Sequence, residues 1–147
     1  MRIAVVNGPN LNLLGTREPS IYGSQRLDEI EARISALCSD RGVELEWHQT
    51  NDEGEFVDLV QAFAGRVNGA VINAAAFTHT SLAIRDALLA VQTPFVEVHL
   101  SNIYAREPER RRSVLADIAL GVVVGFGPMS YQLGVEGLLR HLGHCGD

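Results

Sequence analysis

The chain has 147 residues, of which 46% are hydrophobic and 20% charged, and its formal net charge is −6. All 12 basic residues are arginine, so the sequence contains no lysine. A Schiff-base enzyme needs a lysine amine that condenses with a carbonyl, and a Walker-type nucleotide site needs a lysine that contacts phosphate. Both kinds of site are therefore excluded.

The same composition limits the partners and the location of the protein. The length fits one domain with a substantial core, and no apolar run reaches the ~18 residues that a membrane span requires. The N-terminus lacks the long apolar stretch and the cleavage site of a secretory signal. The acidic balance argues against nonspecific binding to nucleic acid. We expect a cytoplasmic protein that binds neither nucleic acid nor membrane.

The two cysteines, Cys38 and Cys145, do not have the spacing of metal ligands. Cys38 continues the apolar stripe of a predicted helix, which indicates a packed thiol. His141, His144 and Cys145 lie close enough in sequence for a metal site, but a frayed terminus is the simpler interpretation. We therefore expect no metal ion.

Along the chain, short segments that are apolar or alternate between apolar and polar residues are separated by amphipathic segments with helical spacing. Strands are predicted at residues 3–6, 43–49, 70–73, 94–99 and 120–124. Helices are predicted at residues 27–41, 56–67, 81–91 and 131–142, the third capped by Thr80 or Ser81. This alternation predicts an α/β fold, with a five-stranded parallel sheet and helices on both faces. The length favours a flavodoxin-like arrangement, with residues 1–147 as one domain.

In such a sheet, ligands bind at the carboxyl ends of the strands. The first strand is followed by a long connection, residues 7–23, which carries Arg17 and Tyr22. Connections longer than ~12 residues in compact domains are usually functional or disordered. Residues 7–23 could form only an ordered surface loop. We favour the interpretation that they form a functional loop.

Polar side chains also follow the third and fourth predicted strands. The third ends at Asn73 and leads to His79, just before a helix, where a histidine is also a common neighbour of the cap. In the fourth, alternation places Glu97 and His99 on one side of the strand, as an oriented acid–base pair or a buried structural pair. The convergence of three strand ends favours acid–base chemistry on an anionic substrate.

Arginines follow the fourth strand in the same connection. They include Arg106 and the run from Arg110 to Arg112, which is either a solvated face or an anion clamp. Because the chain is acidic, we expect its positive charge to be concentrated at a site.

Related folds with other functions fit the strand ends poorly. A phosphoacceptor receiver domain needs an aspartate after the third strand and a lysine after the fifth, but the chain has Asn73 and no lysine. A flavodoxin needs a hydroxyl-rich loop after its first strand. Residues 125–127 resemble a fragment of a dinucleotide fingerprint, but the following residues break that pattern.

The combined motifs resemble the type II 3-dehydroquinate dehydratases. The matching stretches, in order through nearly the whole chain, are GPNLNLLG at 8–15, REP at 17–19, YG at 22–23, TNDEGE at 50–55, THTS at 78–81, IRDA at 84–87, EVHLSN at 97–102, ARE at 105–107, Arg110, and GFG at 125–127. The family has the flavodoxin-like fold, in agreement with the pattern of strands and helices.

The resemblance implies five catalytic residues. Tyr22 is expected to be the general base that removes a proton beside the substrate ketone, with Arg17 stabilising the tyrosinate. A free tyrosine titrates near ~10, and an adjacent guanidinium lowers that value. Asn12 is expected to position the water that holds the enolate. His99, oriented by Glu97, is expected to protonate the departing C1 hydroxyl.

The resemblance also implies a set of substrate-binding residues. The side chains of Asn73 and Ser101, with the backbone N–H groups of Leu100 and Ser101, are expected to bind the substrate carboxylate. His79 and Arg110 are expected to bind its hydroxyl groups. No metal or organic cofactor is implied.

Two further residues have implied roles beyond direct binding. Arg106 is expected to strengthen the positive field around Tyr22, and Asp86 to reach the site of a neighbouring subunit in a homododecamer built from trimers. The chain departs from the family pattern at residues 74–77, 108–109 and Tyr104, which affect loop packing and not the acid or the base.

The function implied by the resemblance is the reversible anti dehydration of 3-dehydroquinate to 3-dehydroshikimate through an enolate, a step of the shikimate pathway. There are two alternatives. The protein could be a dehydratase that acts on a related cyclic hydroxy acid, or a binding or scaffolding domain without catalytic activity. A scaffold has no need of Tyr22, Arg17 and His99 together. Type I enzymes perform the same dehydration through a lysine Schiff base, a route closed to this chain.

Overall fold

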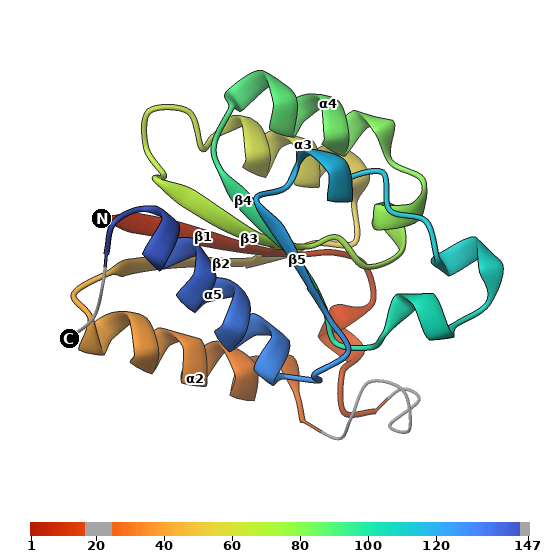
Figure 1. Ribbon diagram of the computed structural model, residues 1–147, viewed down its shortest axis with the longest axis horizontal. Coiled ribbons are helices and arrows are strands. Elements are labelled where there is room, and N and C mark those ends of the chain that lie inside the picture. The colour runs from red at the N-terminus through yellow and green to blue at the C-terminus, as the bar shows by residue number, and fades with distance from the viewer. Residues whose placement is uncertain (17–24, 145–147) are drawn as a thin grey trace.

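The computed structural model describes residues 1–16 and 25–144 and contains a five-stranded parallel sheet (Figure 1). The strands are β1 (Arg2–Asn7), β2 (Glu44–Gln49), β3 (Gly69–Asn73), β4 (Phe95–His99) and β5 (Gly121–Val124). They lie in the order β2-β1-β3-β4-β5. This is the flavodoxin-like order, and it confirms the predicted fold class.

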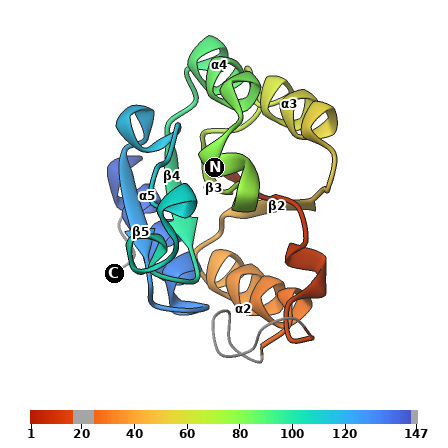
Figure 2. The ribbon, with the colours of Figure 1, turned by 90° about the vertical axis from the view of Figure 1, so that its right-hand side faces the viewer.

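Helices cover both faces of the sheet (Figures 1 and 2). One face packs against α2 (Leu27–Asp40) and α5 (Met129–His141), and the other against α3 (Glu53–Gln61) and α4 (Leu82–Val91). Short 3-10 helices lie in the connections: η1 (Leu11–Leu13), η2 (Ala75–His79), η3 (Ile103–Ala105), η4 (Pro108–Arg110) and η5 (Ala116–Ile118). Because both faces are covered, β3 and β4 are buried along their whole length.

Two helix starts show how the sequence sets local structure. Ser81 Oγ accepts a hydrogen bond of 3.0 Å from the backbone N–H of Ile84, which confirms the predicted cap of α4. Asp52 caps α3 in the same way, through 2.8 Å to the N–H of Glu55. The prediction of a helix at 56–67 was therefore wrong at both ends: Asp52 starts α3 earlier, and the helix ends at Gln61.

Of the two cysteines, only Cys38 lies among the described residues. Cys38 lies on the buried face of α2 with no exposed surface, as the apolar stripe predicted. Near the C-terminus, a ring nitrogen of His144 lies 2.8 Å from the carbonyl oxygen of Arg41, and the nitrogen donates to it. The expectation of fraying is therefore wrong at His144, while Cys145 lies outside the described residues.

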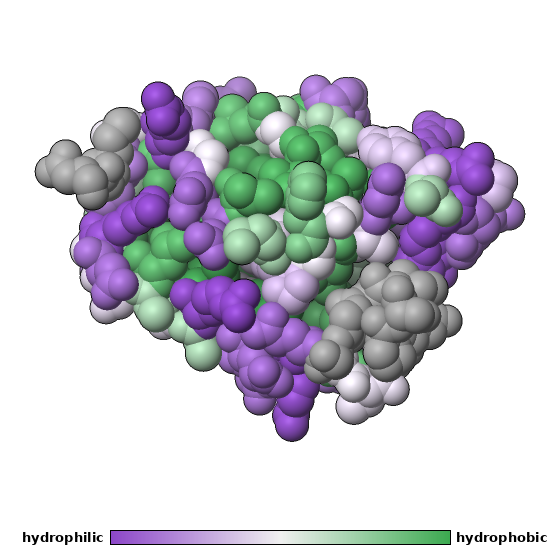
Figure 3. Space-filling model, turned by 60° about the horizontal axis from the view of Figure 1, so that its bottom comes forward, coloured by the Kyte–Doolittle hydropathy of each residue, from purple (hydrophilic) through white to green (hydrophobic). Residues whose placement is uncertain are grey.

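Exposed hydrophobic side chains are concentrated where the edge strand β5 meets α5. Leu120, Val122 and Leu133 are 44%, 37% and 42% exposed. A hydrophobic area is visible on this side of the molecule in Figure 3. Among the described residues, no helix is long and apolar enough to cross a bilayer.

Gly8 brings the carboxyl ends of the two central strands into close contact. Its backbone N–H donates to the carbonyl oxygen of Asn73 over 2.8 Å. A Cβ at this position would lie 2.3 Å from the carbonyl oxygen of Ala74, too close for any side chain. The connections after β1 and β3 can therefore meet only because residue 8 is glycine.

We predict that Gly8→Ala destabilises the protein by about 1–3 kcal/mol or more, because backbone atoms must move to accept the new methyl group. Urea unfolding would measure the change. Gly137→Ala on α5 is the control: a Cβ there has no neighbour within 4 Å. It should raise the free energy of unfolding by about 0.5–1 kcal/mol, as alanine does in helices. Equal effects of the two substitutions would contradict this account of Gly8.

Candidate active site

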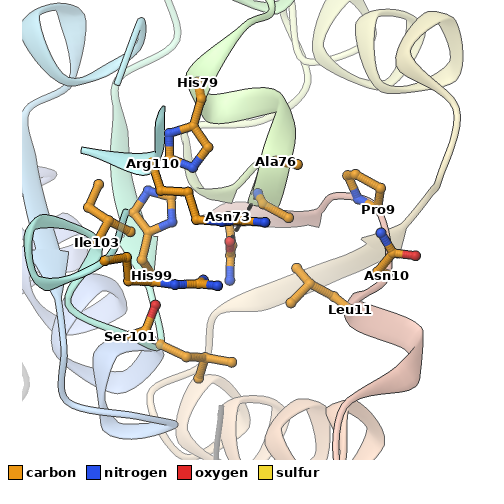
Figure 4. Close-up of a pocket in the computed structure, with 13 residues that line it drawn as sticks. Pro9, Asn10, Leu11, Asn73, Ala76, His79, His99, Ser101, Ile103 and Arg110 are labelled. Atoms are coloured by element: carbon orange, nitrogen blue, oxygen red, sulfur yellow. Dashed lines mark hydrogen bonds between the residues drawn. The ribbon is translucent and has the colours of Figure 1, made fainter. Parts of the chain in front are cut away.

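A cavity of about 140 Å³ opens at the carboxyl ends of β1, β3 and β4. This is the position at which ligands bind in doubly wound sheets, since connections from β1 and β3 leave toward opposite faces. Its described lining residues are Pro9, Asn10, Leu11, Asn73, Ala75, Ala76, His79, His99, Leu100, Ser101, Ile103, Arg106 and Arg110. Figure 4 shows His79, His99 and Arg110 on one side of the cavity, Pro9, Asn10 and Leu11 on the other, and Asn73 between them.

The described lining of the cavity is cationic although the chain is acidic. Two arginines, Arg106 and Arg110, and two histidines, His79 and His99, line it, and none of the described lining residues is a carboxylate. The net charge of the whole chain is −6. Low-dielectric walls lined by one sign of charge focus the field and attract the opposite charge. With two arginines and no carboxylate among its described lining residues, the cavity suits an anion.

His99 is held from beneath by a buried carboxylate. A ring nitrogen of His99 lies 2.7 Å from Glu97 Oε2, and Glu97 has no exposed surface. The other oxygen, Oε1, accepts 2.7 Å from the hydroxyl of Ser113. Both carboxylate oxygens thus have partners, and the imidazole is oriented as the alternation in β4 predicted. Glu97 itself does not line the cavity.

Ser113 is a partner of Glu97 that no sequence pattern predicted. Besides donating to Glu97, its Oγ accepts from the backbone N–H groups of Leu115 and Ala116, each over 3.1 Å. The hydroxyl proton is therefore directed at the carboxylate. No local pattern connects a serine 16 residues downstream with Glu97, because the connection depends on how the long loop after β4 folds back.

His79 is fixed by a main-chain carbonyl of the same loop. Its Nδ1 lies 2.7 Å from the carbonyl oxygen of Arg112, so Nδ1 carries the proton and donates. Burial lowers the pKa of His79, the hydrogen bond to Arg112 opposes this, and His99 and Arg110 lower the pKa further. A neutral ring of this tautomer offers Nε2 as an acceptor, which suits a hydroxyl group.

The arginines are oriented by contacts within their own loop. Arg110 Nε is bonded to Glu107 at 2.5 Å, and Arg106 Nε lies 3.9 Å from the same carboxylate. Arg111 Nε donates 2.7 Å to the carbonyl oxygen of Arg106. The arginine run is therefore neither wholly a solvated face nor wholly a clamp: Arg110 lines the cavity, whereas Arg111 braces the loop.

The floor of the cavity is formed by Asn73 and the turn after β4. Asn73 Oδ1 accepts 3.2 Å from the N–H of Ala75, and Asn73 Nδ2 donates 2.8 Å to the hydroxyl of Tyr131. The carbonyl oxygen of Leu100 accepts 2.9 Å from the N–H of Gly127. The GFG segment at 125–127 thus supports the turn that carries Leu100 and Ser101.

Asn12 and Asp86, which the sequence also predicted as site residues, are not among the described lining of this cavity. Asn12 lines a different one, with Arg26, Trp47 and Gln49 among its neighbours. Asp86 is exposed on α4. Arg17 and Tyr22 lie outside the described residues. Within the described part of the chain, no group of three or more His, Cys, Asp or Glu side chains is placed to hold a metal ion.

Comparison with known proteins places this site in a family. Residues 1–139 match the family model described as dehydroquinase class II. The chain belongs to this family. A 3-dehydroquinate dehydratase of Prochlorococcus marinus (strain NATL1A) is 54% identical over 142 residues, 97% of this chain and 98% of the relative. One of Synechococcus sp. (strain WH7803) is 56% identical, with 97% of each chain covered.

A solved structure agrees with the sequence relatives. The type II dehydroquinase of Butyrivibrio crossotus DSM 2876 superposes with a TM-score of 0.92 at 41% identity, covering 94% of this chain and 97% of that one. At this similarity the two chains share one fold. The resemblance inferred from the sequence motifs is confirmed.

The lowered pKa of His79 predicts how this side chain affects stability with pH. Because the folded protein protonates His79 less readily than the unfolded chain, whose histidines titrate near ~6.5, the unfolded state binds more protons on acidification. The stability from neutral His79 is present above about pH 6.5 and is lost as the pH falls through the lower folded pKa.

Urea unfolding of wild type and His79→Gln across pH 5–8 would test this. Glutamine retains an amide donor for the Arg112 carbonyl but does not titrate. The free energy of unfolding of the wild type minus that of His79→Gln should be constant above about pH 7. It should decrease as the pH falls, because only the wild type loses stability through residue 79. An increase of this difference on acidification would contradict the lowered pKa of His79.

Proposed function

We propose that this dehydroquinase-family protein catalyses the reversible dehydration of 3-dehydroquinate to 3-dehydroshikimate, by anti elimination through an enolate. The observation that carries the proposal is the cationic cavity in which His99, backed by buried Glu97, faces arginine and amide donors. Dehydratase activity also follows from the names of the relatives that match almost the whole chain.

The acid in this mechanism is His99. One ring nitrogen is bonded to Glu97, and the other is left to transfer a proton. Glu97 fixes the orientation of the imidazole, so that His99 can present a proton to the departing C1 hydroxyl as the C1–O bond breaks. The hydroxyl then leaves as water, and the enolate electrons form the C1–C2 double bond.

The base is Tyr22, assisted by Arg17. The tyrosinate takes a proton from C2, and the electrons of the C–H bond move onto the C3 oxygen as the enolate forms. Adjacent guanidinium groups are needed because an ordinary tyrosine is almost wholly protonated at neutral pH. Arg106, which lines the cavity, adds to this field, and Asn12 positions the water that binds the enolate.

The substrate is held by its carboxylate and its hydroxyl groups. Asn73, Ser101 and the N–H groups after β4 bind the carboxylate, at the cavity floor. His79 and Arg110 bind hydroxyl groups on the side wall, the neutral His79 as an acceptor. Placing the reacting atoms between two fixed ends gives the orientation that elimination requires.

We also propose that the protein is cytoplasmic and assembles into a homododecamer, a tetramer of trimers, with Asp86 entering a neighbouring subunit's site. Asp86 is exposed on α4, available for such a contact. The hydrophobic edge at β5 provides a second surface, since an uncovered edge strand with apolar side chains favours association.

Purified protein mixed with 3-dehydroquinate should produce the ultraviolet absorbance of the conjugated product. Tyr22→Phe should lower kcat by about 10³-fold or more with little change in substrate binding, because only the base's hydroxyl is lost. Tyr104→Phe, at an exposed tyrosine, is the matched control and should keep the wild-type rate. Absence of wild-type turnover would overturn the function, whereas a fully active Tyr22→Phe would overturn only the base.

A further inference from the structure

We propose that Tyr131 is a positioning residue that, together with the backbone N–H of Ala75, holds the Asn73 amide so that an N–H group faces the cavity. The inference deepens the carboxylate-binding role given to Asn73 and rests on the proposed function for the identity of the ligand. Tyr131 belongs to α5, and it does not line the cavity. Its hydroxyl is nevertheless bonded to side chains at the carboxyl ends of both central strands.

A series of hydrogen bonds connects His48, Asn7, Tyr131 and Asn73. Its direction is unambiguous at the His48 end. Asn7 Nδ2 lies 3.0 Å from the carbonyl oxygen of His48, which can only accept. The amide nitrogen of Asn7 must therefore face His48, and its oxygen must face Tyr131. The Tyr131 hydroxyl lies 2.6 Å from Asn7 Oδ1 and donates its single proton there.

The other end has an equally fixed direction. The backbone N–H of Ala75, which can only donate, lies 3.2 Å from Asn73 Oδ1. Asn73 Nδ2 then faces the Tyr131 oxygen at 2.8 Å and donates to it. Because the hydroxyl proton is already committed to Asn7, the tyrosine can only accept from Asn73.

Burial prevents water from replacing these partners. Tyr131 and Asn7 have no exposed surface, and Asn73 is 2% exposed. The Tyr131 ring packs against Trp47 with centroids 5.7 Å apart, which holds the phenol in place. Burial also raises the pKa of Tyr131, so the phenol stays a neutral donor. A flipped Asn73 would leave buried acceptors facing one another, which is unfavourable.

The consequence concerns which ligand the cavity accepts. With Nδ2 bonded to Tyr131 through one hydrogen, the second N–H of Asn73 is directed away from it, and Asn73 lines the cavity. A fixed N–H at the floor binds an acceptor such as a carboxylate and rejects a donor such as an ammonium or an amide nitrogen. Tyr131 therefore contributes to specificity without contacting the substrate.

The test is Tyr131→Phe, which keeps the ring and removes the hydroxyl. The KM for 3-dehydroquinate should rise about tenfold while kcat changes less than about threefold, because the loss falls on binding of the carboxylate. Val135→Ala, at a buried residue of the same helix that is outside the hydrogen-bond chain, controls for loss of stability. It should lower the unfolding midpoint without raising KM.

A double-mutant cycle separates positioning from a merely structural role. In an Asn73→Ala background, Tyr131→Phe should raise KM no further, since the amide that it orients is gone. An unchanged KM in the single Tyr131→Phe variant, or an equal rise in both backgrounds, would overturn the proposal.

A crystal structure of Tyr131→Phe gives a readout that does not depend on turnover. The Asn73 side chain should rotate away from its position between Ala75 and residue 131. An unmoved Asn73 would overturn the positioning role. Lack of wild-type turnover would instead overturn the proposed function, leaving this structural comparison to decide the role of Tyr131.

Discussion

The site depends on one constraint: Glu97 is a carboxylate without exposed surface in the strand next to the sheet centre. A buried carboxylate is strongly unfavourable unless it is paired and hydrogen-bonded. Here His99 and Ser113 satisfy its two oxygens. To bring Ser113 to Glu97, the loop after β4 must fold back over the strand ends. That same loop carries Arg106 and Arg110 into the cavity.

Several parts of this loop reinforce its placement. The carbonyl oxygen of Arg112 accepts from His79, and the N–H of Val114 donates 2.9 Å to the carbonyl oxygen of Thr78. These contacts link the loop to η2, at the end of β3. His79 is therefore held by a main-chain carbonyl of this loop, while His99 and Arg110 are held by the carboxylates of Glu97 and Glu107.

The absence of lysine gives this arrangement its chemical meaning. In the proposed mechanism, Tyr22 and His99 transfer the protons, and arginine, imidazole and amide groups supply the charge that stabilises the enolate. Arginine stays charged when partly buried, whereas lysine readily loses its proton there. An all-arginine chain can thus keep its cavity cationic at neutral pH.

Sequence periodicity predicted much of this structure because it reports on burial. Strict alternation in β4 predicted that Glu97 and His99 share a side, and the order of strands and helices predicted the sheet. The start of α3 was missed because the Asp52 cap lies before the apolar stripe. Ser113 and Tyr131 were missed as partners of the site because hydrogen bonds between residues far apart in sequence leave no periodic signal.

The central claim is that two separated groups, a base and His99, remove the elements of water from opposite faces of the substrate. The most direct measurement uses two samples of 3-dehydroquinate, each deuterated at one of the two C2 positions, and mass spectrometry of the product. The account predicts that deuterium anti to the C1 hydroxyl is lost and deuterium syn to it is retained. Loss of the syn deuterium with retention of the anti one would contradict it.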